Sequence, residues 1–303
     1  MSTGYLHPSY AEALSEFGSP RQLPGCQGWV LQRQILGADQ RDAIGCYPLF
    51  SCADWSKLNA DLEQIRDGLV CLAVVTDPFG EYDDAYLREC FPDLVLPFKQ
   101  HFVVDLSRPL DSFVHPHHRR NARKALGQFS VERCARPADF LDDWVDLYQT
   151  LIERHQITGM AAFSRNSFSG QFKVPGIVVF RAVHNNKTAG MLLWYVQGNR
   201  AYYHLGAYSL AGYDLRASFA LFSYSIEYFA GLGTQWLNLG GGAGIRNDAT
   251  DGLSRFKRGW SNETRMAYLC GRIFDRARYE QIAAAKGIQA TDYFPAYRQG
   301  EFV

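Results

Sequence analysis

The stretch QWLNLGGGAGIRNDATDGLSRFKRGW, residues 235–260, decides how the rest of the chain is interpreted. An apolar segment, 236–239, predicts a strand that runs directly into four glycines between positions 240 and 244. Glycine accepts positive φ and lets another group approach the backbone closely. A polar turn and a short helix carrying Phe256 and Lys257 are expected to follow. The pattern fits a ligand-binding turn, and it also fits a wide turn before a helix with a buried aromatic face.

The charge composition limits which classes of partner the whole chain can attract. The chain has 303 residues, of which 47% are apolar, enough for one large domain or two ordinary ones. Its 31 basic side chains balance 31 acidic ones, so no overall field attracts nucleic acid or a membrane surface. A polyanion would therefore have to bind a local patch.

Cysteine usage and the N-terminus both favour the cytoplasm. The seven cysteines are scattered and never form a CxxC pair, which is typical of reduced thiols. The opening segment lacks a basic region followed by an apolar run, and no 18 consecutive residues are apolar. We expect a cytoplasmic protein without a membrane span.

The first hundred residues predict a mixed α/β layer. The run LVCLAVVTDP, 69–78, is continuously apolar and predicts a strand buried on both faces. The other expected elements are strands over 28–35, 42–50 and 94–106 and helices over 54–66 and 83–90.

The remaining two thirds repeat this outline. Three β-prone runs, 176–183, 188–196 and 200–208, are separated by tight turns and predict an antiparallel meander. The segment 157–175 is expected to be a long loop that acts as a lid or contacts substrate. The other expected elements are strands over 129–134, 236–239 and 264–274 and helices over 137–151, 215–230 and 275–286.

A basic segment, HPHHRRNARKAL at 115–126, lies between the two halves. On a helix its cations share one broad face, and the segment is either a solvated linker helix or a phosphate-binding patch, because guanidinium groups match phosphate oxygens in pairs. These cations are Arg119, Arg120, Arg123 and Lys124. The three histidines lack further soft or imidazole ligands at suitable spacing, so no metal site is expected.

The strand ending in LGGG, the following DGLSRFKRGW and the basic segment together resemble the Fem-like (FemABX-type) aminoacyl/peptidyltransferases of the GNAT superfamily. The resemblance covers roughly residues 100–275. It implies two tandem GNAT-like domains with mixed α/β central sheets flanked by helices. These would be an N-terminal domain at 1–108, a basic linker helix at 109–128 and a C-terminal domain at 129–303 whose last helix packs back on the first domain.

The resemblance also implies roles for particular residues. Lys257 matches the lysine that stabilises the negative charge developing in acyl transfer, and Phe256 could stack on the terminal adenosine of a tRNA. The other expected substrate-binding residues are Gly240, Gly241, Gly242, Arg258, Arg216, Tyr208 and His204. Arg119, Arg120, Arg123 and Lys124 would contact the phosphates of a tRNA backbone or of a nucleotide-linked acceptor. The general base stays open, since Tyr203 and His204 on a strand bordering the cleft could each serve or could each be structural.

The implied function is amide-bond formation, with an amino acid transferred from aminoacyl-tRNA to the amine of a small or peptide-like acceptor. Aminoacyl-tRNA would be a co-substrate, and no other cofactor is expected.

An acyl-CoA donor is the alternative. The Q/RxxGxG/A loop that binds the pyrophosphate in acetyl-CoA-dependent GNAT enzymes is represented only by Gly212 and Arg216, which puts coenzyme A binding in doubt. Fem-type cell-wall enzymes often carry a coiled-coil arm in the second domain, and this chain has no heptad run for one. Its absence weakens the case for a cell-wall precursor as the acceptor. A non-catalytic binding protein of the same fold is the remaining alternative. GxSxG, P-loop and HExxH motifs do not occur.

Overall fold

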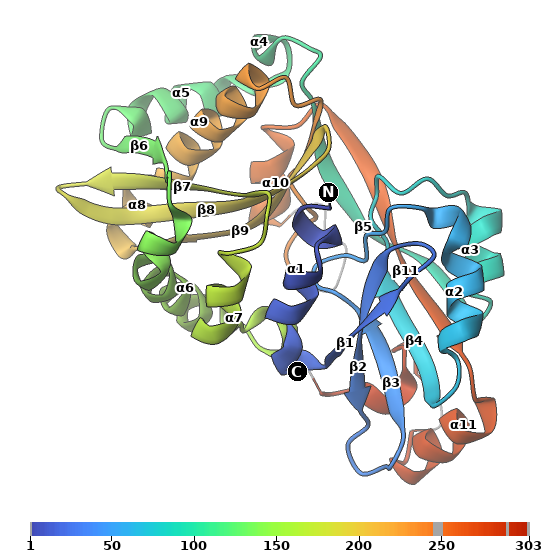
Figure 1. The fold of residues 1–303 in the computed structure, drawn as a ribbon. Helices are drawn as coiled ribbons and strands as arrows, with labels where there is room; N and C mark the ends of the chain where they lie inside the picture. The colour runs from blue at the N-terminus through green and yellow to red at the C-terminus, as the bar shows by residue number, and fades with distance from the viewer. Residues whose placement is uncertain (1, 245–250, 289–290, 302–303) are drawn as a thin grey trace. The chain divides into compact units, whose positions relative to one another are not determined.

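The computed structural model describes residues 2–244, 251–288 and 291–301. The chain folds into two compact units (Figure 1). Unit 1 comprises Met1–Gly4, Lys99–Ile157 and Ser164–Arg265. Unit 2 comprises Tyr5–Phe98, Thr158–Phe163 and Met266–Val303. Unit 1 therefore takes in residues 99–108, and unit 2 takes in the C-terminal helix 276–285. The expected domain boundaries at 108 and 129 stay a prediction.

Unit 2 contains a mixed sheet with the strand order β1-β2-β3-β4-β11. The strands are β1 Ser19–Leu23, β2 Gly28–Gln34, β3 Arg41–Gly45, β4 Leu69–Val75 and β11 Glu263–Ile273, the last of which enters this unit at Met266. All neighbours are antiparallel except β3 and β4. A parallel pair needs a crossover connection, and α2, Leu58–Ile65, provides it.

Strand β4 is buried on both faces, as its apolar sequence predicts. Leu72 and Val74 belong to a core cluster with Leu62 of α2. Val70 and Cys71 belong to a second cluster, which includes two buried residues of α11. The remaining helices of unit 2 are α1 Pro8–Ala13, α3 Asp84–Cys90 and α11 Arg276–Ala285.

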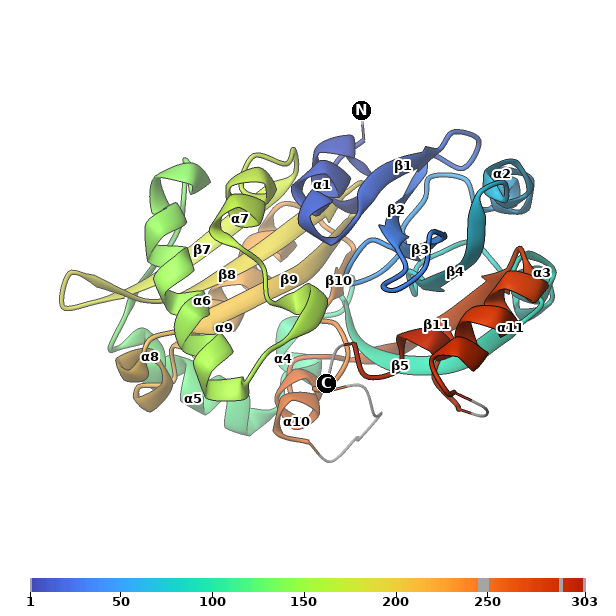
Figure 2. The ribbon, with the colours of Figure 1, turned by 90° about the horizontal axis from the view of Figure 1, so that it is seen from below.

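Unit 1 contains a second mixed sheet, with the strand order β5-β10-β9-β8-β7-β6. The strands are β5 Leu94–Asp105, which enters the unit at Lys99, β6 Ser130–Arg133, β7 Ile177–His184, β8 Lys187–Gln197, β9 Arg200–Tyr208 and β10 Trp236–Asn238. Figure 2 shows β7, β8 and β9 side by side, and their antiparallel pairing confirms the predicted meander. The parallel pair β9 and β10 is joined through α9, Ala217–Gly231.

Helices cover both faces of the unit 1 sheet (Figure 1). One face carries α9 and α5, Pro116–Leu126, while the other carries α6, Leu141–His155, and α7, Arg165–Gln171. The shorter helices are α4 Leu110–Phe113, α8 Leu210–Asp214 and α10 Gly252–Arg258. Short 3-10 helices occupy Gly4–Leu6, Ser15–Phe17, Trp55–Lys57, Pro137–Phe140, Gly159–Ala161 and Ala296–Arg298.

The two sheets share one pairing pattern. From β1 to β11 the successive pairs are antiparallel, antiparallel, parallel and antiparallel, and the same series runs from β7 to β5. In each case the closing strand comes from the other half of the sequence, since β5 follows β4 in the chain and β11 follows β10. The predicted mixed α/β fold is confirmed, and its repeat is visible in the pairing.

Several local predictions differ from the structure. The expected loop 157–175 contains helix α7, whose N-cap is Ser164, and the elements α1, α8 and β1 were not expected. The linker helix expected over 109–128 consists of two helices, α4 and α5. A residue before proline avoids helical φ and ψ, so α5 begins separately at Pro116. Within the described residues, no helix combines the length and apolar character required to cross a membrane.

Candidate active site

A glycine turn begins where β10 ends, in unit 1. Gly240 has φ +76°, and its N–H donates to Asn238 Oδ1 at 2.8 Å. Its carbonyl accepts from the N–H of Phe102 on β5 at 3.1 Å. Because a side chain at this φ would be strained, glycine is required, and the turn leaves the sheet in one fixed direction. The polar turn at 245–250 lies outside the described residues.

The chain returns to this turn through the N-terminus of α10. Asp251 is the N-cap, and its Oδ1 accepts from the N–H groups of Leu253 at 2.8 Å and Ser254 at 2.9 Å. The Ser254 hydroxyl donates to the other carboxylate oxygen. A Cβ on Gly242 would lie 2.3 Å from Ser254 Oγ, so only glycine lets the turn approach this cap. The cap therefore fixes the helix that carries Lys257.

Lys257 is buried at the centre of the site, with 5% of its surface exposed. Its Nζ donates to the carbonyl of Gly241 at 2.6 Å and lies 5.5 Å from the centre of the Tyr203 ring. Burial lowers the pKa of Lys257 from 10.5 to about 7; Asp251 opposes this shift and Lys99 adds to it. Near neutral pH the group therefore exchanges between ammonium and amine.

Two further polar groups, from β5, complete the site. Lys99 is 7% exposed, and its Nζ donates to the carbonyl of Ala243 at 3.3 Å. His101 Nδ1 lies 3.0 Å from Asn238 Oδ1, and burial lowers the pKa of His101 to about 4, so the imidazole is neutral. Sequence reasoning missed both residues. The sequence did hold a signal for them: they are two polar residues two positions apart in an apolar strand, and such residues share one face of the strand.

Phe256 packs inside unit 1. Its ring centre lies 5.1 Å from Phe219, 4.9 Å from Phe222, 5.5 Å from His118 and 6.2 Å from Trp260. Its carbonyl lies 2.9 Å from His118 Nε2. These contacts give the ring a structural role in holding α10 against α5 and α9, and stacking on a nucleobase stays a prediction.

The structure does not bring His204 together with Lys257. His204 Nε2 lies 3.0 Å from Gln171 Oε1 of α7, whereas Tyr203 packs on Phe222 of α9, across the sheet. Burial lowers the pKa of His204 to about 3, which makes the imidazole a weak base at neutral pH.

The other expected substrate-binding residues are dispersed within unit 1. A Cβ on Gly206 would meet the hydroxyl oxygens of Tyr203 at 2.4 Å and Tyr208 at 3.2 Å, so these two hydroxyls lie near each other. Arg216, at φ +63°, donates to Asn121 Oδ1 and joins the start of α9 to α5. Arg258 is exposed, with its guanidinium 5.6 Å from the ring centre of Phe102. The Tyr208 hydroxyl thus lies near that of Tyr203, whose ring centre is 5.5 Å from Lys257 Nζ.

The four cations of the basic segment are all exposed on α5. Arg119 and Arg123 border a cavity of about 510 Å³, together with Asp111, Glu227 and Trp260. Arg120 and Lys124 do not border it. Phosphate binding by these residues stays a prediction.

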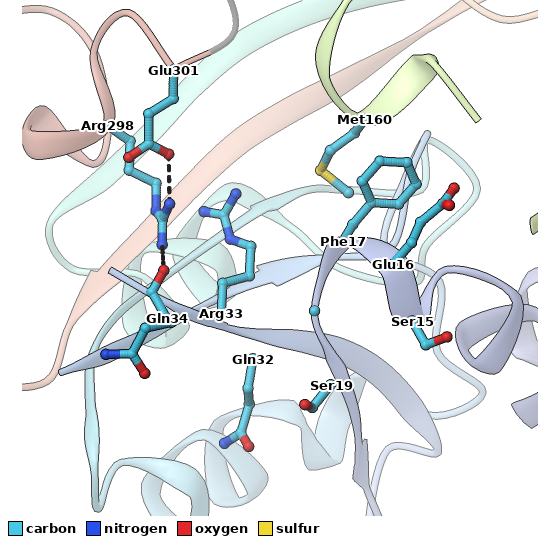
Figure 3. Close-up of a pocket in the computed structure, with 11 residues that line it drawn as sticks. Ser15, Glu16, Phe17, Ser19, Gln32, Arg33, Gln34, Met160, Arg298 and Glu301 are labelled. Carbon is cyan, nitrogen blue, oxygen red and sulfur yellow. Dashed lines mark hydrogen bonds and ion pairs between the residues drawn. The ribbon is translucent and has the colours of Figure 1, made fainter. Parts of the chain in front are cut away.

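Unit 2 has a cavity of its own, of about 450 Å³ (Figure 3). Arg33 borders it, is 8% exposed, and pairs through Nε with Asp42 Oδ1 at 3.3 Å. Arg298, also on its wall, donates to the buried carboxylate of Asp42 and to Glu301. The cavity wall therefore holds two guanidinium groups that are paired with the same buried carboxylate.

The histidines of the basic segment do not gather around a metal position. His115 caps α5, and the Nε2 of His118 is engaged by the Phe256 carbonyl. Within 2–244, 251–288 and 291–301, no group of three or more His, Cys, Asp or Glu residues is placed to hold a metal ion.

Residues 117–258 match the family model described as an acetyltransferase (GNAT) domain. This segment is a GNAT domain. This domain contains α5, the meander, the glycine turn and Lys257, and it lies in unit 1 apart from residues 158–163. No curated protein matches the sequence.

Solved structures with the same fold extend the likeness beyond the GNAT domain. FemX has a TM-score of 0.66 at 13% identity, covering 91% of this chain and 93% of FemX. The C-terminal domain of a putative lysylphosphatidylglycerol synthetase from Agrobacterium fabrum has a TM-score of 0.60 at 13% identity, covering 93% of this chain and 92% of the other. L-PGS from Bacillus licheniformis has a TM-score of 0.54 at 15% identity, covering 94% and 98%. The chain thus has the Fem-like GNAT fold.

Proposed function

We propose that this protein transfers an aminoacyl group from aminoacyl-tRNA to the amine of a small or peptide-like acceptor. The observation that carries the proposal is a buried Lys257 whose Nζ points at a glycine turn inside a GNAT acyltransferase domain. The Fem-like fold, shared with FemX and with lysylphosphatidylglycerol synthetases, supports an aminoacyl donor.

The chemistry follows from the charge on Lys257. The acceptor amine attacks the carbonyl carbon of the aminoacyl ester, and the carbonyl oxygen becomes negative in the tetrahedral intermediate. An ammonium group in a dry site stabilises that oxygen more strongly than it would in water. The C–O bond to the ribose then breaks, the amide carbonyl reforms, and the proton lost by the amine balances the proton gained by the ribose oxygen.

The start of α9 favours tRNA over coenzyme A as the donor. In the GNAT fold a pyrophosphate would approach the N-terminus of this helix. Here Arg216 occupies the N-cap in a left-handed conformation and is held by Asn121. Gly212 belongs to α8, where a Cβ would lie 2.0 Å from the Ala189 carbonyl oxygen, so this glycine serves close packing.

The experiment that tests the proposal offers the protein radiolabelled aminoacyl-tRNAs and, separately, acyl-CoAs, with a panel of small and peptide-like amines. We expect label to move from aminoacyl-tRNA and the activity to be sensitive to RNase. Lys257→Met should lower kcat at least a hundredfold, whereas Lys187→Met, at an exposed position of β8, should not. Transfer from acyl-CoA alone would refute the tRNA donor, and ligand binding without transfer would favour a binding protein.

The cysteines support a cytoplasmic location. All seven are free and buried. Free thiols persist in a reducing compartment, and we propose that the protein works there.

A further inference from the structure

The cavity of about 510 Å³ in unit 1 is bordered by α5, by α9 and by the segment 110–114. Figure 1 shows α5 and α9 side by side on one face of the unit 1 sheet. The volume lies within the range of roughly 300–1,000 Å³ that small-molecule sites occupy. Among the described residues, neither Lys257 nor any residue of the 240–244 turn lines this cavity. It is therefore a second candidate binding site, separate from the candidate active site.

Apolar side chains form much of the cavity wall. The buried ones are Val114, Ala122, Ile226 and Trp260. Leu126 also borders the cavity, yet 40% of its surface is exposed to water. Covering an exposed leucine with an apolar group of a ligand is favourable, because it removes both surfaces from water. The wall therefore favours a ligand with an apolar body.

Four charged side chains border the same cavity, two of each sign. All four are exposed, and they are Arg119 and Arg123 on α5, Asp111 on α4 and Glu227 on α9. Arg119 Nη1 donates to the backbone carbonyl of Asp111 at 3.3 Å. Glu227 accepts from Ser223 Oγ of its own helix at 3.2 Å. Within the described parts of the chain, none of the four forms an ion pair, and the Arg123 guanidinium makes no hydrogen bond. Opposite charges thus border one cavity without neutralising each other by direct contact.

A ligand with one charge of each sign matches this arrangement better than a simple ion does. A carboxylate can pair with a guanidinium through charge-assisted hydrogen bonds, and an ammonium group can pair with a carboxylate in the same way. A phosphate would approach two carboxylates as well as two guanidinium groups, so its attraction to the cavity would largely cancel. Charge balance and the apolar wall together describe a zwitterion with an apolar side chain.

We propose that the cavity between α5 and α9 binds an apolar α-amino acid. The carboxylate of the ligand pairs with Arg123, and its ammonium group pairs with Glu227. The side chain of the ligand lies against Ile226 and Trp260. This binding site goes beyond the proposed function and does not depend on it. Arg123 is thereby assigned to a carboxylate, whereas the family resemblance implied a phosphate.

The first experiment locates the ligand by NMR of the full chain with ¹⁵N-labelled tryptophan. The indole resonance of Trp260 is assigned by its loss in Trp260→Phe. Titration with L-phenylalanine or L-leucine should shift this resonance saturably, because Trp260 lines the cavity. Glycine should bind at least about tenfold more weakly, since it has no side chain to bury. Binding that leaves the Trp260 resonance unchanged, or the lack of any saturable binding, would overturn the site.

The second experiment tests whether the ligand needs both charges. The compound 3-phenylpropionate lacks the ammonium group of phenylalanine, and phenethylamine lacks its carboxylate. Each should bind about tenfold more weakly than phenylalanine, because one charge-assisted pair is lost. Affinity equal to that of phenylalanine for either compound would refute a zwitterion site. A Trp260 shift caused by AMP but not by phenylalanine would indicate a phosphate site and would overturn the proposal.

Variants of exposed residues assign each charge with little risk to folding. Arg123→Gln should weaken phenylalanine and 3-phenylpropionate about tenfold and leave phenethylamine unchanged, and Glu227→Gln should weaken phenylalanine and phenethylamine instead. Arg120→Gln is the matched control, because Arg120 is exposed on the same helix but does not border the cavity. Unchanged phenylalanine affinity in Arg123→Gln, or an equal loss in Arg120→Gln, would overturn the assignment.

A cavity-filling variant tests the location independently of charge. Ser223 is half-buried on the cavity wall, and Ser223→Phe should abolish the binding of phenylalanine by occupying its space. Retention of wild-type affinity in this variant would place the ligand elsewhere and refute the site. If the wild-type protein transfers from no donor yet binds phenylalanine at Trp260, the proposed function fails and the amino-acid site stands.

Discussion

Replacing Lys257 with methionine should stabilise the protein at neutral pH and progressively less at alkaline pH. The pKa of Lys257 is about 7 in the folded chain and 10.5 in an ordinary environment. Between these values the unfolded chain binds more protons, so the free energy of unfolding of the wild type rises with pH. At low pH, where Lys257 is charged in both states, burying its ammonium group costs the folded state roughly 5 kcal/mol. This cost follows from the difference of about 3.5 pKa units, since one unit is about 1.36 kcal/mol.

The same arithmetic gives the size of the pH dependence. At pH 7 Lys257 is charged in half of the folded molecules, and its burial costs the folded state about 4 kcal/mol. At pH 9 this cost is about 2 kcal/mol. Methionine fills a similar volume but leaves the Gly241 carbonyl without its donor, which costs about 1–3 kcal/mol at either pH. Lys257→Met should therefore be about 2 kcal/mol more stable than the wild type at pH 7 and about equal to it at pH 9.

Urea unfolding at pH 6, 7, 8 and 9, followed by circular dichroism, measures this difference. Subtracting wild type from variant at each pH cancels all other titrating groups. Lys124→Met is the matched control, because Lys124 is exposed and should give a difference near zero throughout. A Lys257→Met difference that stays constant from pH 7 to pH 9 would show that the ammonium is not desolvated, and the burial argument would be refuted.

Three further outcomes are expected. Single-turnover transfer should slow as pH rises through about 7, because the Lys257 ammonium is lost there; rates between pH 6 and 8.5 check this. Asp251→Ala should cost about 1 kcal/mol of urea stability through the lost cap, and NMR should show the pKa of Lys257 lowered further, since Asp251 raises it. Arg298→Met should lower the free energy of unfolding by about 3 kcal/mol, because it removes one of the two guanidinium groups paired with the fully buried Asp42 carboxylate; a loss below 1 kcal/mol would contradict that dependence.

The sequence predicted those features that depend on neighbouring residues. The apolar run 69–78 indicated a strand covered on both faces, and the alternating runs between 176 and 208 indicated a meander. The glycines after Leu239 indicated a turn entering a helix. These signals are local, since strand period, φ restrictions and capping act within a few residues.

The placement of side chains around Lys257 could not be predicted in the same way. Lys99 and His101 reach the site because β5 pairs with β10, more than 130 positions later in the chain. His204 was expected beside the cleft, yet a register shift in the β8 and β9 pairing lies next to it and its ring faces α7. Such placements depend on pairing between distant segments, which local preferences do not specify.

The sequence by itself determined the mixed α/β class, the glycine turn and the candidacy of Lys257. Tertiary structure alone decided that Lys257 is buried, that Lys99 shares its turn, and that β5 and β11 each close the sheet formed by the other half of the chain. The physical reason is that a pKa and a charge balance depend on the solvent and charges that surround a group. Those surroundings are assembled only when segments distant in sequence come together.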